Sequence, residues 1–216
     1  MLYYTFYKKF PEKNGFSSIE EGIHNVLKED FIKNEALEIL NYKRSHIDFI
    51  PKKNEYDFVC PLEVGCQYNT RQIMAAFGEF NEKRSPEFRE GVKYFKDLKT
   101  DIFLINLNKS EKDFSPSTMY EDYAINDHLF HWQSQSRDKM KSEKIQRYIH
   151  HKKTGNNISF FVREFKNIGS YTSPYTFLGN ADYVSCEAEQ PVNFIWKLHE
   201  PIPGKLLEKA NKAIAN

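Results

Sequence analysis

The stretch LFHWQSQ, residues 129–135, alternates between two kinds of side chain. Neighbouring side chains of a β-strand point to opposite faces of a sheet, so the alternation predicts a strand with one largely apolar face and one polar face. The first face carries Phe130, Trp132 and Ser134. The second face carries Leu129, His131, Gln133 and Gln135. A strand of this kind belongs in a sheet that covers a core on one side.

Other stretches have the length and composition of strands, and several have helical spacing. The expected strands are residues 2–7, 91–97, 101–106, 158–162, 175–179 and 192–198. The expected helices are a pair over residues 19–40, 71–77 with Thr70 as its N-cap, 138–151 and 205–215. Helices followed by many strands with one inserted helix predict an α+β fold with a strongly bent or barrel-like sheet.

The bulk composition excludes several classes of protein. The 216 residues carry a net charge of +1, so DNA binding would need local basic patches rather than a global field. The three cysteines, Cys60, Cys66 and Cys186, have no CxxC spacing and predict neither a disulfide framework nor a zinc site. No signal region or membrane-length apolar run is present, which predicts a cytoplasmic protein with no membrane partner.

Hydrogen-bonding and aromatic side chains are densest within residues 108–136. Such a stretch faces a ligand unless its polar groups are satisfied inside the fold. Two interpretations stay open: Phe130 and Trp132 are core residues beside a wet face, or the segment lines a pocket that reads a base. The pocket candidates are Tyr120, Asp122, Tyr123, Phe130, His131, Trp132, Gln133 and Gln135.

The strongest local positive charge lies between Arg137 and Lys153, where seven Lys or Arg residues accompany two acidic ones. Such a segment is either a solvated surface or a contact for DNA phosphates. The phosphate-binding candidates across the chain are Arg71, Lys109, Ser115, Lys141, Lys144, Arg147 and Arg163.

Two alternative functions compete with DNA recognition. Glu164 and Lys166 form an ExK at the end of an apolar strand, a pattern that metal-dependent nucleases use to hold Mg²⁺ and orient water. The chain could also be a non-catalytic scaffold or dimerisation domain. Signatures for other enzymes, such as GxGxxG, Walker A, HExxH and GxSxG, are missing.

Several strings of the sequence resemble one known domain family. They are YNTRQIMAAFG (68–78), GVKYF (91–95), DYAI (122–125), LFHWQSQS (129–136), FFVRE (160–164), SPYTFLG (173–179) and IWKLHEPIP (195–203). The family is a domain of unknown function at the C-terminus of bacterial DEAD/DEAH-type helicases, many of which also carry a phospholipase-D-like nuclease. The resemblance spans residues 65–203.

The resemblance extends to type IV restriction endonucleases, which cut DNA containing 5-methylcytosine or 5-hydroxymethylcytosine. It implies an SRA-like (PUA-like) bent sheet or β-barrel with flanking helices over residues 61–216, and a helical connector to an upstream motor over residues 1–60. The expected partners are double-stranded DNA with modified cytosine and the helicase and nuclease domains of the same polypeptide. The domain itself would have no catalytic residue, metal or cofactor, with ATP and Mg²⁺ used elsewhere in the full-length enzyme.

An SRA-like domain would flip the modified nucleotide out of the duplex, at a cost of a few kcal/mol. Stacking on aromatic rings offsets this cost by about 1–3 kcal/mol per base. Two of the rings Tyr120, Tyr123, Phe130 and Trp132 are the candidates for that contact. Asp122 is the first choice to accept a hydrogen bond from the cytosine N4 amino group, and His131, Gln133 and Gln135 are the alternatives.

Overall fold

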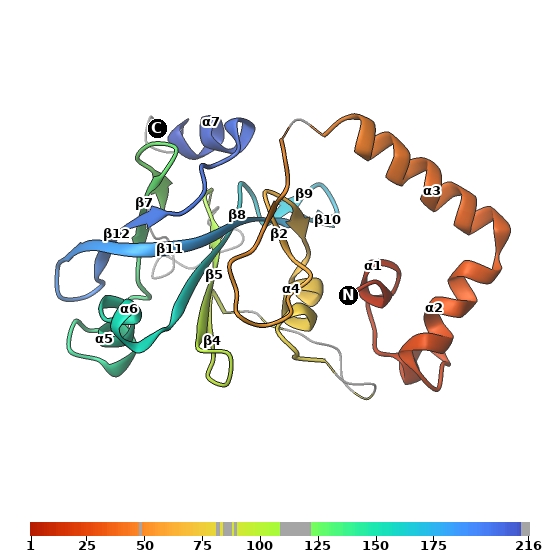
Figure 1. Cartoon of the computed structure of the whole chain (residues 1–216), viewed down its shortest axis with the longest axis horizontal. Helices are drawn as coiled ribbons and strands as arrows, with labels where there is room; N and C mark the ends of the chain where they lie inside the picture. The colour runs from red at the N-terminus through yellow and green to blue at the C-terminus, as the bar shows by residue number, and fades with distance from the viewer. Residues whose placement is uncertain (48, 81–82, 84–87, 89, 109–121, 213–216) are drawn as a thin grey trace. The chain divides into compact units, whose positions relative to one another are not determined.

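The computed structural model of the chain describes every residue except 48, 81–82, 84–87, 89, 109–121 and 213–216 (Figure 1). The chain forms two compact units. Unit 1 comprises residues 1–50 and 68–89, and unit 2 comprises residues 51–67 and 90–216. The predicted division into residues 1–60 and 61–216 therefore differs from the division into compact units, because residues 68–89 group with the N-terminal helices.

Unit 1 is helical. It contains α1 (Tyr3–Phe6), a 3-10 turn (Pro11–Asn14), α2 (Ile19–Lys28), α3 (Asp30–Ser45) and α4 (Thr70–Ala76). Helices α2 and α3 confirm the expected helical pair, and the Ser18 hydroxyl caps α2 by accepting a hydrogen bond from the Glu21 N–H at 3.1 Å.

Two predictions for unit 1 are wrong. Residues 2–7 are expected to form a strand, but Tyr3–Phe6 form the short helix α1, and the Tyr3 ring stacks on that of Tyr7, which follows the helix in extended backbone (centroids 4.9 Å apart). The N-cap of α4 is Asn69 rather than Thr70. Asn69 and Gln72 form a capping box, in which each side chain accepts a hydrogen bond from the other residue's backbone N–H.

Unit 2 is built on a mixed sheet. The short strands are β1 (Lys52–Lys53), β2 (Glu63–Val64), β3 (Gln67–Tyr68, at the junction of the units), β9 (Asn167–Ile168) and β10 (Tyr171–Thr172). The main sheet has the order β4 (Val92–Phe95), β5 (Thr100–Asn106), β8 (Asn157–Arg163), β11 (Tyr175–Glu187), β12 (Asn193–Leu198), β7 (Leu129–Gln133) and β6 (Tyr123–Ala124). Strands β5 and β8 are parallel, and the other neighbours in this order are antiparallel.

The sheet curls because the two halves of the long strand β11 pair with different strands. Residues 176–180 of β11 pair with β8, residues 181–187 pair with β12, and a bulge interrupts each pairing. The curl brings Phe103 of β5 against Trp132 of β7, with ring centroids 4.2 Å apart, although three strands separate β5 from β7 in the sheet order. The α+β class is confirmed. Within the described residues the sheet is bent but not closed into a barrel, because β4 and β6, at its two ends, do not pair with each other.

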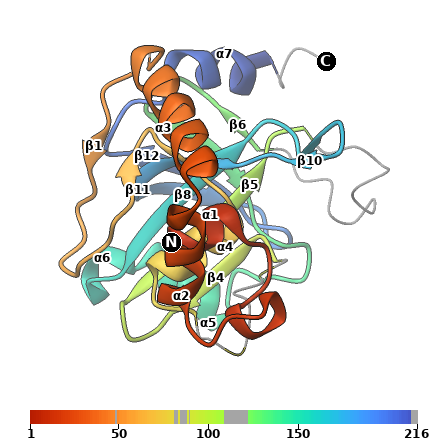
Figure 2. The same cartoon turned by 90° about the vertical axis from the view of Figure 1, so that its right-hand side faces the viewer.

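Three helices accompany the sheet in unit 2: α5 (Glu143–Ile149), α6 (His151–Thr154) and α7 (Gly204–Lys212). Buried residues of α5 and α7 join the aromatic core inside the curl, and α7 packs on β6 (Figure 2). Helix α5 begins five residues later than the predicted Asp138, because Ser142 caps it and Asp138 is buried in an ion pair with Lys144. No helix in the described part of the chain has the length and apolar character needed to cross a bilayer.

We expect Gly179 to be the most sensitive glycine of the sheet. It has φ +82° beside the first bulge of β11, and a Cβ there would lie 3.2 Å from Cγ2 of Val64. The Gly179→Ala variant should lose about 1–2 kcal/mol of unfolding free energy from left-handed strain alone, measured by urea denaturation. The control is Gly204→Ala, where a Cβ meets nothing within 4 Å. Equal midpoints for the two variants would contradict the assignment.

Candidate nucleic-acid interface

The outer face of β6, β7 and β12 carries the polar side chains of the predicted site. Burial along β7 alternates as the sequence predicts, with Phe130 and Trp132 buried and their neighbours half-buried. The strand register places Tyr123 opposite His131, and His131 opposite Ile195. It also places Gln133 opposite Asn193. Two rows of side chains therefore cross this half of the sheet on its outer face.

The rings of Tyr123 and His131 stack across β6 and β7. Their centroids are 4.5 Å apart and their planes are 12° from parallel, so the ring faces point along the strand-to-strand direction. Strand β6 ends the sheet order, and no strand lies beyond it in the described part of the chain. The stacked pair therefore lies at the last strand of the sheet order, on which α7 also packs.

Hydrogen bonds orient the second row. The Gln133 side chain donates from Nε2 to Oδ1 of Asn193 at 2.9 Å. The backbone N–H of Gln133 donates to Oδ1 of Asp122 at 3.0 Å, and Asp122 is only 5% exposed. Asp122, the first choice for the N4 contact, is thus a buried residue that holds β7 in place. The alternatives His131 and Gln133 are half-buried on the outer face.

Phe130 and Trp132 are core residues, as the first of the two sequence interpretations has it. Phe130 is fully buried and packs edge-to-face on Phe160, and Trp132 stacks on Phe103. Neither ring presents a face to solvent, so neither can sandwich a base in this conformation. Gln135 lies past the end of β7, where its Oε1 accepts a hydrogen bond from Lys144 at 2.9 Å. Tyr120 lies outside the described residues.

Three of the predicted phosphate-binding cations are engaged inside unit 2. Arg147 donates from Nε and from one terminal nitrogen to the Asp101 carboxylate, at 2.8 Å each, and stacks on the Tyr94 ring. Lys144 pairs with Asp138 at 2.7 Å. Arg163 is 8% exposed and donates to Asn106 and to the Ser173 carbonyl. These bonds give all three cations structural roles.

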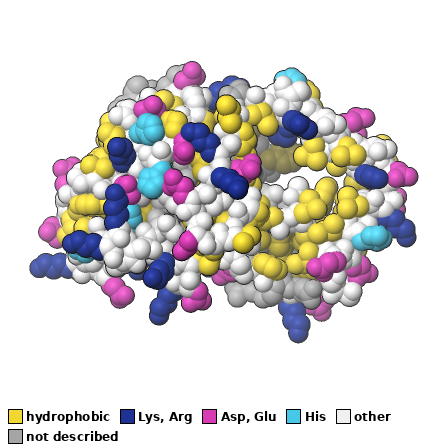
Figure 3. Space-filling model, viewed as in Figure 1, with side chains coloured by type: hydrophobic (Ala, Val, Ile, Leu, Met, Phe, Trp, Pro, Cys, Tyr) yellow, Lys and Arg dark blue, Asp and Glu magenta, His cyan; other side chains and the backbone are white. Residues whose placement is uncertain are grey.

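Exposed cations remain on the loop between β7 and α5. Lys141 is exposed, as are Arg137 and Lys139, which the sequence analysis did not select. The loop is tied to the β11–β12 turn by hydrogen bonds from Gln190 to the Ser136 carbonyl (3.0 Å) and from the Met140 N–H to the Glu189 carbonyl (3.2 Å). On the face shown in Figure 3, basic and acidic side chains are interspersed, so this loop provides only a local patch.

The other candidates lie away from this face or outside the described residues. Arg71 is half-buried on α4 in unit 1. Lys109 and Ser115 lie outside the described residues. For the nuclease alternative, Glu164 pairs with Lys209 at 2.6 Å. Among the described residues, no group of three or more His, Cys, Asp or Glu side chains is arranged to hold a metal ion.

Sequence reasoning missed Asn193 and Ile195, which come from β12. The alternation in VNFIWKL places both on the solvated face of that strand, with Phe194 and Trp196 buried. That signal was present in the sequence. The pairing of β12 with β7 was not, because strand order depends on contacts distant in sequence.

Unit 2 is thus an α+β domain whose curled sheet leaves stacked rings and carboxamides on its outer face. Residues 62–210 match DUF3427, a domain of unknown function. The match covers more than half of the 216 residues, and the protein belongs to the DUF3427 family. A search of curated proteins gives no match to this chain.

Arg147 is bonded inside unit 2 whereas Lys141 is exposed, so we expect alanine at the first position to lower stability and alanine at the second to leave stability almost unchanged. Arg147→Ala leaves Asp101, which is 1% exposed, without its ion-pair partner and should cost about 3 kcal/mol in urea unfolding. Lys141→Ala should change the stability by less than about 0.5 kcal/mol. If Lys141 contacts a phosphate, its loss should lower the slope of log affinity for DNA against log salt by about one. The reverse pattern would contradict this division.

Proposed function

We propose that unit 2 is a DNA-recognition domain for modified cytosine, 5-methylcytosine or 5-hydroxymethylcytosine, in duplex DNA. In this proposal the domain provides specificity to a modification-dependent, ATP-driven restriction endonuclease in the defence against foreign DNA. It carries no catalytic residue itself. It takes the modified base by flipping the nucleotide out of the stack.

The observation that supports the proposal most directly is the Tyr123–His131 stack at the sheet edge. A flipped base can extend the column on the Tyr123 face that points away from His131. Stacking of a base contributes about 1–3 kcal/mol, comparable to the few kcal/mol that unstacking and unpairing cost. In this proposal, stacking on Tyr123 offsets the cost of holding the base outside the duplex.

Specificity for cytosine requires an acceptor for its N4 amino group, because thymine presents a carbonyl at that position. The half-buried candidates for this acceptor are His131 and Gln133 on β7, and the hydrogen bond from Gln133 Nε2 to Asn193 leaves Oε1 as the acceptor atom of that carboxamide. Burial of the methyl group adds about 0.8 kcal/mol, close to fourfold in affinity. The exposed cations Arg137, Lys139 and Lys141 supply phosphate contacts next to the end of β7.

The sequence resemblance supports the same function. Residues 65–203 resemble the C-terminal part of SauUSI, a type IV restriction endonuclease that cuts DNA with modified cytosine. On this proposal the partners are modified duplex DNA and the upstream helicase and nuclease domains of one cytoplasmic polypeptide. ATP and Mg²⁺ then act on those other domains.

The proposal predicts how the chain discriminates two duplexes that differ only in one 5-methylcytosine. In an anisotropy titration at fixed salt without Mg²⁺, the 216-residue chain should bind the methylated duplex more tightly. Tyr123→Ala should weaken binding to the methylated duplex by about 5- to 150-fold, which corresponds to the 1–3 kcal/mol of one stacked base.

The matched control is Tyr42→Ala on α3, because Tyr42 also stacks on a histidine, His46, at 4.1 Å. This variant should bind like the unaltered chain. Equal binding of both duplexes by the unaltered chain would overturn the proposal. A concentration-dependent dimer with no DNA affinity would favour the scaffold function instead. Mg²⁺-dependent nicking that disappears in Glu164→Ala would favour the nuclease.

A further inference from the structure

Residues 51–67, here called the strap, belong to unit 2 although the chain on both sides of them belongs to unit 1. The chain passes from unit 1 to unit 2 at residue 51, returns at residue 68 and passes again at residue 90. The two ends of the strap are therefore two of the three places at which the chain passes between unit 1 and unit 2. The contacts between the strap and the rest of unit 2 determine how mobile the strap is.

Backbone pairing and burial hold the second half of the strap. Leu62 is fully buried, the Gly65 N–H donates to the Phe177 carbonyl at 2.7 Å, and the Phe177 N–H donates to the Cys66 carbonyl at 2.9 Å. These contacts carry no titratable group. The strength of these contacts therefore does not depend on the protonation of a side chain.

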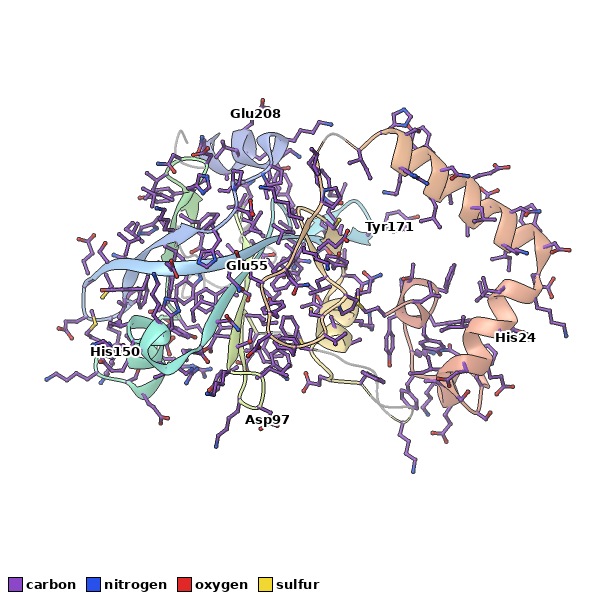
Figure 4. The ribbon with its side chains drawn as sticks, in the orientation of Figure 1. His24, Glu55, Asp97, His150, Tyr171 and Glu208 are labelled. Atoms are coloured by element: carbon purple, nitrogen blue, oxygen red, sulfur yellow. The ribbon has the colours of Figure 1, made fainter. Side chains whose placement is uncertain are left out.

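Ion pairs also hold the first half of the strap. Lys52 pairs with Glu200, and Glu55 pairs with Nδ1 of His199, just after β12. The other ring nitrogen of His199, Nε2, lies 3.2 Å from Oδ1 of Asp182 on β11. Tyr56 adds neutral contacts, because its hydroxyl donates a hydrogen bond to Ser159 at 2.8 Å and its ring stacks on Phe177 with centroids 6.2 Å apart. Figure 4 labels Glu55 on the strap.

Both ring nitrogens of His199 face a carboxylate, and a carboxylate only accepts hydrogen bonds. A neutral imidazole has one N–H and can satisfy one of the two partners, whereas the imidazolium ion satisfies both. We infer that His199 is a pH-dependent latch, which fastens the first half of the strap to unit 2 when protonated and loosens it when neutral.

The surrounding charges agree with this assignment. Among the described residues, the titratable or charged groups near His199 include Lys52 and Glu55 of the strap, Asp182 of β11, Lys197 opposite Asp182 on β12, His128 beside Leu198, His151 and Lys152 of α6, and Glu200. Lys152 pairs with the second oxygen of Asp182 at 2.8 Å. His151 is neutral near neutral pH, because burial lowers its pKa and its Nε2 accepts the Tyr183 N–H.

The direction of the pH effect follows from the two pKa shifts. Burial lowers the pKa of His199, but the bonds to Glu55 and Asp182 outweigh burial and raise this pKa above its ordinary value. The latch is therefore fully closed below about pH 6.5, the ordinary histidine value, and opens as the pH rises through the raised pKa. Burial raises the pKa of Asp182, but Lys152 and His199 outweigh it and lower that pKa, so the Asp182 carboxylate stays ionised throughout the range in which His199 titrates.

Hydrogen exchange of the full chain tests the latch. The amides of Lys52 and Lys53, paired with β2, should lose protection several-fold between about pH 6 and pH 9, after correction for the intrinsic exchange rate. His199→Gln should show low protection at both pH values. His199→Arg, which keeps a charge at every pH, should show high protection at both.

Two controls separate the latch from a general loosening. His150→Gln, at an exposed histidine labelled in Figure 4, should keep the unaltered pH dependence. Amides of β8 and β11 should keep their protection in every variant. Identical profiles for the unaltered chain and His199→Gln would overturn the inference, as would a pH-dependent loss of protection in His199→Arg.

Discussion

The contact between Phe103 and Trp132 is the constraint on which the rest of unit 2 depends. It joins strands that lie far apart in the sheet order, so it exists only while the sheet is curled. Trp196, Phe160 and Tyr148 surround Phe103 and exclude water from the interior. Each aromatic pair adds about 0.5–1.5 kcal/mol beyond its buried area. Once the inner face is committed to this core, the opposite face of β6, β7 and β12 is left for polar side chains and for a ligand.

Some charged residues of unit 2 are bonded in its interior, and others are exposed on its surface. Arg147 and Asp101 join α5 to the start of β5, and the Asn156 side chain donates a further hydrogen bond to Asp101 at 2.9 Å. Arg163 braces the β9–β10 hairpin by donating to the Ser173 carbonyl. Arg147 is costly to move because the buried Asp101 carboxylate would lose its charge compensation, and Arg163 because oxygen atoms of Asn106 and Ser173 would lose a hydrogen bond. In the proposed function, phosphate contacts therefore come from exposed side chains such as Lys141, and the affinity for DNA depends on salt.

Local patterns predicted most elements but not their assembly. The alternation in residues 129–135 gave the correct faces for His131 and Trp132, since period two is a property of any strand. It could not decide whether Trp132 faces a core or a pocket, because that depends on Phe103, distant in sequence. The same limit applies to Arg147, whose helix looked like a basic surface until the fold placed Asp101 beside it. The strand expected at residues 175–179 continues to Glu187 because β8 and β12 pair with its two halves.

The central claim is that a flipped modified base lies against the Tyr123–His131 stack. Photo-crosslinking of the 216-residue chain to a duplex with 5-iodocytosine at the modified position, followed by mass spectrometry of the peptides, tests it most directly. The account predicts a crosslink within the strand that contains Tyr123, reduced by competition with the same duplex carrying 5-methylcytosine. A crosslink confined to unit 1, or one that the methylated duplex does not displace, would contradict the account.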